Sequence, residues 1–402
     1  MPDWTALAAD LDTADPLASF RGEFVIDDPD LCYLDGNSLG RLPKRTIPRV
    51  EAALRQQWGG RLIRGWNDGW LDLPVRLAAM LAKVLNVKPA EVLIGDTTSL
   101  NLYKLALGAL RACERKTILT TADNFPSDLY ILQGLGAELE VVEPKTLEAS
   151  ISSQTAVVTA SHVAYGSGQR IDLAHLSAVA HEQGAWSLWD LSHSVGVVPL
   201  DLSSSDMAVG CGYKYLNGGP GVPAFLYLRS DLQETVLNPI QGWFGQDKPF
   251  AFDPQYSPVA GIAKFQISTP SVLSMVALES GLELYLEAGS ELVWQKAVSL
   301  TAFFIEMVTT EMPGQFEVVT PLDPAQRGAH VSLRHPDAWR ITRALTERMN
   351  VIPDFRRPDM VRFGFSPLTT SFSEVATAVH RLTKVMEDQI FDEISDEMPT
   401  VT

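Results

Sequence analysis

The sequence predicts an α/β protein with a three-layer large domain, built on a mostly parallel sheet, and a smaller α+β domain at the C-terminal end. Through the middle of the chain, short runs that are apolar on both faces alternate with segments of helical periodicity. Such runs suit a buried parallel sheet, and the alternation is typical of a sheet with helices on both sides. After Gly242 the pattern changes to a loop-rich passage, a long helix and a region of mixed helices and short strands.

Six runs in the alternating part are rich in β-branched and apolar residues, which favour strands. The predicted strands are 117–121, 139–143, 155–164, 185–192, 207–213 and 222–228. Helical periodicity predicts helices over 73–86, from about 99, over 127–136, over 172–183 and over 271–288. Asp172 is the expected N-cap of the fourth helix, because its side chain can accept a hydrogen bond from a free backbone N–H of the first turn.

Three parts are expected along the chain. Residues 1–45 form an N-terminal arm that packs near the small domain, 46–288 form the large domain, and 289–402 form the small C-terminal domain. In the last part the runs FEVVT, HVSLR, VIPDF and MVRFGF are predicted strands.

The composition is that of an ordinary globular protein with a strong negative charge. Of the 402 residues 46 % are hydrophobic and 20 % are charged, and the formal net charge is −17. This charge argues against a nucleic acid or an anionic membrane as partner, since both require surplus lysine and arginine. Three scattered cysteines are too few for a disulfide framework or a metal cage, so no metal site is expected. The first residues lack an apolar signal segment, and no apolar run approaches the length of a membrane span, so a cytoplasmic protein is expected.

The most informative stretch is WDLSHSVGVVPLDLSSSDMAVGCGYKYLNGGPG, residues 189–221. Asp190 and His193 stand 24 and 21 residues before Lys214, a spacing that suits two neighbouring strands whose ends face one pocket. An acid that holds a protonated ring nitrogen and a lysine that forms an imine are what pyridoxal phosphate requires. Each residue also has an ordinary alternative: an exposed lysine at a strand end, an aspartate in a helix cap or buried salt bridge, and a core histidine.

Other segments carry weaker signals. Thr97, Thr98 and Ser99 stand where a helix begins, which suits either a phosphate site or a simple N-cap. Phe125 precedes a proline at a strand–helix junction and could stack on a planar cofactor, although most such rings belong to the core. Arg362 ends an apolar run and suits bidentate binding of a carboxylate, with a surface ion pair as the alternative.

Motifs of other enzyme classes are missing where those folds need them. No G-x-G-x-x-G follows the first predicted strand, which counts against a nicotinamide-binding domain. P-loop, H-E-x-x-H and G-x-S-x-G motifs do not occur either, so the sequence does not indicate a nucleotide hydrolase, a zinc protease or an α/β-hydrolase.

Taken together, the motifs resemble those of the kynureninases, a family of fold-type-I pyridoxal-phosphate-dependent enzymes. The resemblance runs from YLDGNSLG (33–40) to RFGFSPLTTSF (362–372). Its most specific pieces are LDGNSLG, NFPSDLY, WDLSHSVG, GYKYLNGGPG, GWFG and FQISTPS. It implies the fold-type-I transferase fold, the cofactor pyridoxal 5′-phosphate, and hydrolytic cleavage of L-kynurenine to anthranilate and L-alanine. The pathway could be tryptophan degradation or NAD biosynthesis.

The resemblance also implies site residues. Lys214 would bind the cofactor covalently, Asp190 would pair with its ring nitrogen with His193 nearby, and Tyr213 would hold phosphate and transfer a proton. Further cofactor contacts would come from Thr98, Ser99, Phe125, Asp128 and Ser161, and, across a homodimer interface, from Trp243 and Thr269. The substrate would be bound by Arg362, Ser38 and Trp66.

Two positions bear on the substrate. Thr269 stands where animal-type members of the family have asparagine, and with Trp66 it resembles the bacterial type, which implies a preference for kynurenine over 3-hydroxykynurenine. Two alternatives to this function are another fold-type-I enzyme, such as a cysteine desulfurase or an aminotransferase, and a catalytically silent binding protein. A desulfurase would need a reactive cysteine on a mobile loop, whereas Cys32, Cys113 and Cys211 stand in apolar or strand-like settings.

Overall fold

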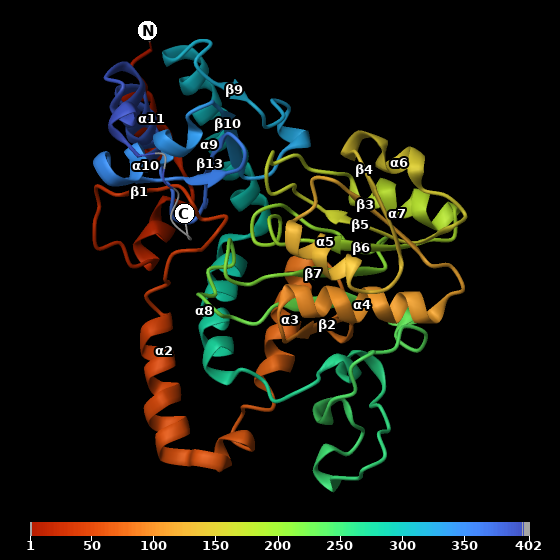
Figure 1. Cartoon of the computed structure of the whole chain (residues 1–402). Coiled ribbons are helices and arrows are strands. Elements are labelled where there is room, and N and C mark those ends of the chain that lie inside the picture. Colours follow the sequence, from red (N-terminus) through yellow and green to blue (C-terminus); the bar gives the residue numbers. More distant parts are fainter. Residues whose placement is uncertain (1, 396, 398–402) are drawn as a thin grey trace.

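A computed structural model describes residues 2–395 and residue 397 of the chain. Its centre is a seven-stranded sheet in the order β2-β8-β7-β6-β5-β3-β4 (Figure 1). The strands are β2 (Val92–Ile94), β3 (Thr117–Thr121), β4 (Glu138–Val142), β5 (Thr155–Ser161), β6 (Trp186–Asp190), β7 (Met207–Gly210) and β8 (Phe225–Leu228). Only β8 runs antiparallel to its neighbours, β7 and β2. The carboxyl ends of the other six strands therefore share one edge of the sheet with the start of β8.

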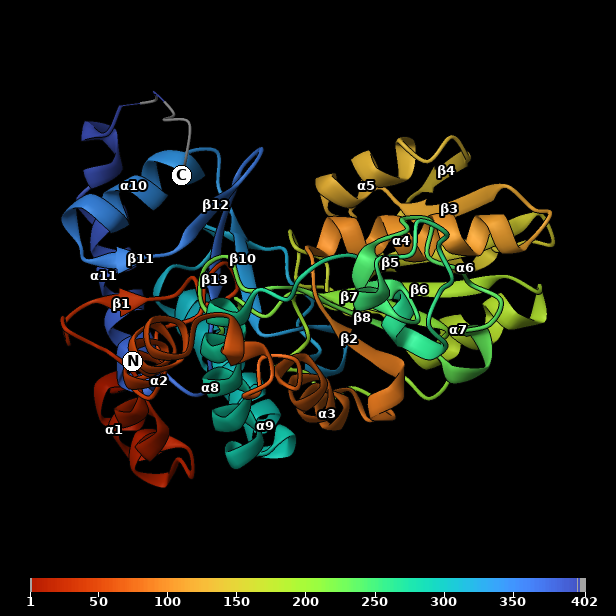
Figure 2. The same cartoon turned by 90° about the horizontal axis from the view of Figure 1, so that it is seen from below.

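Helices cover both faces of this sheet, as Figure 2 shows. On one face lie α4 (Thr98–Ala112) and α5 (Pro126–Gln133), which share a core with residues such as Val157 and Leu188. On the other face lie α3 (Leu73–Leu85), α7 (Leu173–Glu182) and α8 (Val272–Ala288), which pack on residues such as Val158 and Trp189. Successive strand residues thus enter opposite cores, which is why these strands are apolar throughout. The short α6 (Leu147–Ser150) lies beside β3.

A second, smaller sheet has the antiparallel order β12-β13-β10-β9. Its strands are β9 (Glu317–Val318), β10 (His330–Arg334), β12 (Asp354–Arg356) and β13 (Met360–Gly364). It shares a core with α9 (Ser290–Glu311), α10 (Ala338–Arg348) and α11 (Phe372–Glu387). The N-terminal arm joins this core: α1 (Trp4–Ala14) packs on α11, and β1 (Cys32–Tyr33) pairs with β11 (Val351–Ile352).

Two segments project from the lower side of the molecule in Figure 1. One is α2 (Thr46–Ala52), which continues into a wider helical turn over Ala53–Gly59 and a 3₁₀ turn over Leu62–Trp66. The other is the loop-rich passage between β8 and α8, whose regular structure is limited to short 3₁₀ turns. Large apolar side chains are exposed on both, among them Trp58, Ile63, Trp243, Phe250 and Phe252.

The six strands predicted for the large sheet are confirmed, although three of them, β5, β6 and β7, end two to three residues earlier than predicted, because polar site residues follow directly. Asp172 caps α7 as predicted, accepting from the His175 N–H at 3.0 Å. Two features differ from the sequence analysis. The short β2 was not foreseen, and the predicted strand VIPDF is divided at Pro353, which has no N–H to donate, into β11 and β12.

The expectation that no segment reaches the length of a membrane span needs a correction. Among the described residues one helix, α9, is long and apolar enough by length and composition, with a mean hydropathy of 1.2. Half of its most apolar 18-residue stretch is buried inside the protein, and Leu300, Phe304 and Met307 of this helix belong to the small-domain core.

Helix α8 passes so close to the loop after β7 that only glycine fits at residue 281. A Cβ atom there would lie 1.9 Å from the Leu216 carbonyl oxygen. We expect Gly281→Ala to lower the free energy of unfolding by about 1–3 kcal/mol, because helix and loop must separate. Chemical denaturation measures this. Gly22→Ala is the matched control, since no atom lies within 4 Å of the added methyl group; equal stability of both variants would contradict the close contact.

Candidate active site

A cavity of about 360 Å³ opens at the edge of the large sheet where the parallel strands end. Its walls come from the loops after β2, β3, β6 and β7 and from the segment before β8. The lining residues are Asp96, Thr97, Thr98, Ser99, Phe125, Ser127, Asp128, Asp190, Ser192, His193, Cys211, Tyr213, Lys214, Gly221, Val222 and Ala224. Ligand sites of open α/β sheets characteristically lie at this edge. The structure thus brings together eight of the site residues that the resemblance implies, and Thr97 lies beside them.

Lys214 is the most constrained of these residues. Its side chain is only 9 % exposed, and its Nζ lies 2.9 Å from His193 Nε2. Burial lowers the pKa of Lys214, against the opposing effect of Cys211 and Asp190. The backbone is held as well: Gly40 donates its N–H to the Tyr213 carbonyl at 2.8 Å, and a Cβ at Gly40 would lie 2.3 Å from the Lys214 oxygen. The amine is therefore fixed in position and shifted toward its neutral, nucleophilic form.

Two buried carboxyl groups, Asp190 and Asp128, lie close together in the cavity wall. Asp190 Oδ1 accepts from the Ser192 N–H at 2.8 Å and from its hydroxyl at 2.6 Å. Burial raises the pKa of Asp190, while the Ser192 hydrogen bonds oppose this. Burial and then the charge of Asp190 raise the pKa of Asp128 well above its usual range. Within the described part of the chain, Asp128 Oδ2 is buried without a hydrogen-bond partner. This pair is short of one positive charge or donor.

His193 is a neutral ring in this environment. Burial, followed by the charges of Lys214 and Arg362, holds the pKa of His193 well below its usual range. Its ring packs edge-on against His330, with the centroids 5.7 Å apart. A neutral imidazole beside Lys214 exchanges a hydrogen bond with the amine without adding a charge to the cavity.

The opposite end of the cavity suits an anion. Thr97 caps α4 by accepting from the Leu100 N–H at 3.2 Å, so Thr98 and Ser99 lie in the first helical turn. Backbone N–H groups and hydroxyls at a helix N-terminus favour phosphate. Asp96, which lines the same end, is paired with the buried Lys104 at 2.7 Å, and this pairing offsets its negative charge.

Phe125 and Ser161 are linked by a residue that the sequence analysis missed. Ser161 does not line the cavity; its hydroxyl donates to Asn124 Oδ1 at 2.7 Å, and the same oxygen accepts from the Phe125 N–H at 2.9 Å. The Phe125 ring packs edge-on against Tyr165, with the centroids 5.3 Å apart. Asn124 thereby ties the end of β5 to the loop that carries Phe125.

Arg362 lies outside this cavity wall, at the junction with the small sheet, and is fully buried. Its Nη1 donates to the Tyr165 carbonyl at 2.7 Å, and its Nη2 donates to Ser38 Oγ at 3.1 Å and to Asp354. With the Asn37 amide turned so that its oxygen faces the guanidinium, that oxygen accepts from Arg362 Nε at 2.8 Å. Ser38 and Arg362 thus form one hydrogen-bonded group, and Lys214 feels the charge of Arg362.

Three of the expected residues lie away from the Lys214 cavity. Trp66, Trp243 and Thr269 are absent from its walls, and Thr269 is exposed. The Trp243 and Phe244 rings have centroids 4.5 Å apart, and the Trp66 and Phe244 rings 6.5 Å apart. The two tryptophans therefore belong to one aromatic cluster on the projecting segments.

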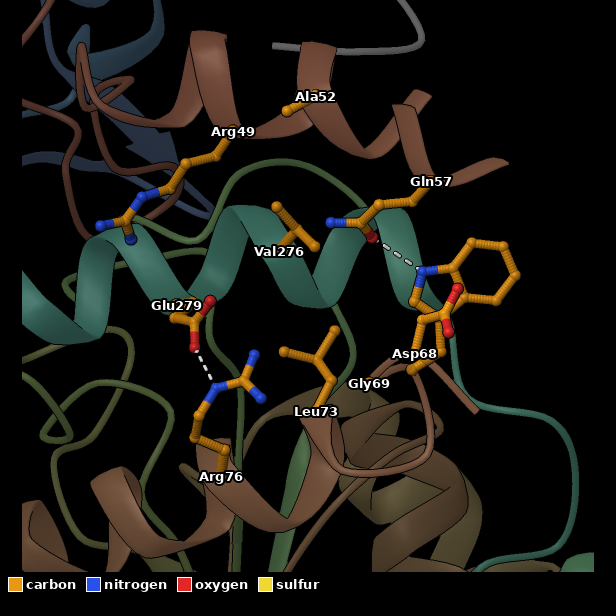
Figure 3. A pocket seen from close by; sticks show the side chains of 10 residues that line it. Arg49, Ala52, Gln57, Asp68, Gly69, Leu73, Arg76, Val276 and Glu279 are labelled. Carbon is orange, nitrogen blue, oxygen red and sulfur yellow. Dashed lines mark hydrogen bonds and ion pairs between the residues drawn. The ribbon is translucent and has the colours of Figure 1, made fainter. Parts of the chain in front are cut away.

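A second cavity, of about 310 Å³, lies between α2, α3 and α8 (Figure 3). Four of its polar groups pair with one another: Arg76 Nε contacts Glu279 at 2.6 Å, and Trp70 Nε1 donates to Gln57 at 2.8 Å. Its lining residues do not include a nucleophile and an unpaired acid that point toward the same position. We therefore place the chemistry at the Lys214 cavity.

Cys211 is the one cysteine that lines the Lys214 cavity. It follows β7 directly, is 2 % exposed, and burial raises the pKa of its thiol. A rigid, protonated thiol at a strand end is not the mobile nucleophile that a desulfurase requires.

Comparisons with known proteins agree with this geometry. A family model described as the kynureninase C-terminal domain matches residues 293–382. The chain is 42 % identical over 393 residues to the kynureninase of Pseudomonas fluorescens, covering 94 % of both chains. It is also 42 % identical over 397 residues to the kynureninase of Deinococcus radiodurans, covering 94 % of this chain and 95 % of that one.

Solved structures of the same fold include a cystine C–S lyase, C-DES, in complex with cysteine persulfide. It has a TM-score of 0.76 at 21 % identity and covers 88 % of this chain and 98 % of its own. The apo cysteine desulfurase of Thermococcus onnurineus has a TM-score of 0.76 at 18 % identity, covering 95 % and 98 %. At these identities the likeness concerns the fold, and it confirms the predicted fold-type-I architecture.

Proposed function

This chain belongs to the kynureninase family, and we propose that its active site is the cavity around Lys214. The reaction is hydrolytic cleavage of the Cβ–Cγ bond of L-kynurenine, which gives anthranilate and L-alanine, with pyridoxal 5′-phosphate as cofactor. The observation that carries the site assignment is a buried amine, Lys214, in the same cavity as a buried carboxyl pair, Asp190 and Asp128.

The residues present fit this cofactor. The buried Asp128 Oδ2 has no partner among the described residues, and a protonated ring nitrogen near Asp190 would supply the positive charge that the carboxyl pair lacks. At the other end, Thr98 and Ser99 at the start of α4 would hold the phosphate, together with Tyr213. Phe125 lines the same cavity, and its ring would stack on the cofactor.

When bound, pyridoxal phosphate takes up the electrons of bonds that break at the substrate's α-carbon. Lys214 supplies the amine that removes and returns the α-proton, and burial keeps that amine toward its neutral form at neutral pH. Burial raises the pKa of Tyr213 far above neutrality, so its phenol keeps its proton and donates hydrogen bonds. Arg362 and Ser38 bind the substrate's carboxylate, and His193 holds the amine of Lys214 by the contact of 2.9 Å.

The experiment that tests this function follows the anthranilate product by its fluorescence after L-kynurenine is added to the holoenzyme. Lys214→Ala should lose turnover by at least about a thousandfold, because no other group in the cavity replaces the proton-transferring amine. The visible absorbance of the bound cofactor should shift as well. Cys211→Ala is the control from the same cavity and should retain activity. Turnover by Lys214→Ala at the wild-type rate would refute the assignment.

We further propose that the enzyme is a homodimer in which each subunit completes the other's site. Trp243 is 41 % exposed and Phe252 77 % exposed, and a monomer has no reason to leave such large rings in water. Gly242 lies so close to Ile267 that a Cβ would be 1.9 Å from its carbonyl oxygen, which puts Trp243 beside the segment of Thr269. Because Trp66 joins the same aromatic cluster, it would reach the partner's site together with Trp243 and Thr269.

Mixed dimers test this arrangement. Lys214→Ala and Trp243→Ala chains, each impaired alone, should recover about a quarter of wild-type activity when refolded together, because half of the dimers then contain one intact site. The matched control pairs Lys214→Ala with Phe125→Ala, two residues of the same chain's cavity, and should show no recovery. Equal recovery in both mixtures, or a monomer in light scattering, would contradict the shared site.

The substrate preference is also a proposal. Thr269 is shorter than the asparagine of the animal-type enzymes and lies on the exposed surface beside Trp243, so it offers no amide to a 3-hydroxyl group. We expect kcat/KM for kynurenine to exceed that for 3-hydroxykynurenine at least about fivefold, the effect of one hydrogen bond of about 1 kcal/mol. Thr269→Asn should reduce the ratio of the two kcat/KM values, whereas Thr269→Ser should leave it unchanged. A wild-type preference for 3-hydroxykynurenine would refute this.

We propose a cytoplasmic location, because the three cysteines are free thiols and none is paired in a disulfide among the described residues. The domain limits at residues 45 and 288 likewise remain proposals. The segment 289–402 is then the small domain, which begins with α9.

A further inference from the structure

Four charged side chains surround the expected carboxylate site, and only one of them was singled out in the sequence. Arg362 on β13 and Asp354 on β12 form an ion pair that is almost fully buried. Arg356 Nη2 contacts the same Asp354 Oδ2 at 2.6 Å. Asp35, which forms a bridge to Gly364 at the end of β13, lies against this group. Two guanidinium groups thus face two carboxyl groups in a balanced cluster, which we call the arginine–aspartate cluster.

The donors of Arg362 are almost all in use. A guanidinium of this kind has five N–H groups. Asn37, the Tyr165 carbonyl, Ser38 and Asp354 accept from four of them. A substrate carboxylate that binds through two parallel hydrogen bonds must therefore share Nη2 with Ser38 or Asp354.

Binding of the substrate consequently adds a third carboxylate to the cluster. Three carboxylates beside two guanidinium groups leave one net negative charge in a buried place, which is unfavourable in a low-dielectric environment. A proton taken up by one of the aspartates restores the balance. The question is which aspartate accepts it.

The contacts select Asp35. Asp354 Oδ2 already contacts Arg362, Arg356 and, at 3.3 Å, the Ser38 hydroxyl, so three donors surround this oxygen. Asp35 Oδ1, by contrast, is buried without a hydrogen-bond partner in the part of the chain that the structure describes. Burial, and then the charge of Asp354, raise the pKa of Asp35 to about 6, against the effect of Ser38, Arg362 and Arg356.

The remaining groups that face Asp35 do not compete for the proton. Tyr33 and Tyr215 both feel the charge of Asp35, and burial raises the pKa of each phenol far above neutrality. Arg41 faces Tyr33, and a guanidinium keeps its charge throughout the neutral range.

We propose that Asp35 is a positioning residue that takes up a proton from solvent when the substrate's carboxylate binds Arg362. This rests on the proposed function, since it assigns the carboxylate subsite to Arg362. When Asp35 is neutral, the charge of Arg356 neutralises that of Asp354. The charge of Arg362 is then free to neutralise the substrate's carboxylate.

Isothermal titration calorimetry of the holoenzyme with benzoylpropanoate tests the proposal. This ligand has the carboxylate and aryl ketone of the substrate but no amine, so it cannot condense with the cofactor or release an amine proton. Titrations at neutral pH in buffers of different ionisation enthalpy count the protons. We expect uptake that approaches one proton per site, and a Kd that is constant below about pH 6 and weakens up to about tenfold per pH unit above it. Binding weakens as the pH rises, because the carboxylate of the bound ligand raises the pKa of Asp35 further. The complex therefore holds a proton on Asp35 that the free enzyme loses above about pH 6.

Asp35→Asn should bind benzoylpropanoate with a Kd that is nearly independent of pH and with no uptake at Asp35. Asp10→Asn, which removes an exposed carboxylate on α1, is the matched control and should behave as the wild type. Wild-type binding without proton uptake would overturn the proposal even if Asp35→Asn failed to fold. The same proton count in wild type and Asp35→Asn would also overturn it.

The two assignments fail in different ways. If L-kynurenine is not cleaved, the proposed function is wrong. If kynurenine is cleaved and benzoylpropanoate binds without a linked proton, only the role of Asp35 is wrong.

Discussion

The burial of the Lys214 amine is the constraint on which the rest of this structure depends. An amine in water at neutral pH carries a proton and is a poor base, whereas burial lowers the pKa of Lys214. Such burial requires close packing of the loop after β7. Gly40 approaches its backbone from the N-terminal arm and Gly281 approaches it from α8, each at a distance that leaves no room for a Cβ atom. Parts of the chain that are far apart in sequence thus cooperate to hold one side chain.

Charge is arranged along the site so that each end suits a different part of the ligands. The carboxyl pair Asp190 and Asp128 favours a cation, and the N-terminus of α4 favours an anion. The arginine–aspartate cluster lies at the junction with the small sheet, and in our proposal it accepts a second anion together with a proton. Since a carboxylate and a phosphate repel each other, the proposed separate sites for the two would allow both to bind. The net charge of −17 does not argue against these proposed anion sites, because the local field at a site depends on nearby groups and not on the total charge.

The sheet could be predicted from the sequence because its strands are buried on both faces, and the prediction of β3 and of β10 was correct at both ends. The three-residue β2 was missed, since so short a run carries no periodicity. The pairing of β8 against β7 was not predictable either, because the direction of a strand leaves no mark on its composition. Asn124 and Asp354 were missed for a similar reason: each acts through a partner on another element, Ser161 in one case and Arg362 in the other. Asn124 and Asp354 lie in the NFPSDLY and VIPDF runs, but their neighbours in the sequence do not indicate which side chains they contact.

By itself, the sequence determined the chemical groups and their order: a lysine and an acid at the ends of adjacent strands, hydroxyls at a helix start, and an arginine at the end of a late strand. These signals are local, because strand ends and helix caps depend on neighbouring residues. Only the tertiary structure decided which groups share a cavity, since Lys214 meets His193 and Arg362 meets Asp354 through contacts between separate elements. It also placed Trp66 and Trp243 together on an exposed surface, away from Lys214. Burial is the largest cause of the pKa shifts of Lys214, His193, Asp190 and Asp128, and burial is a property of the folded chain alone.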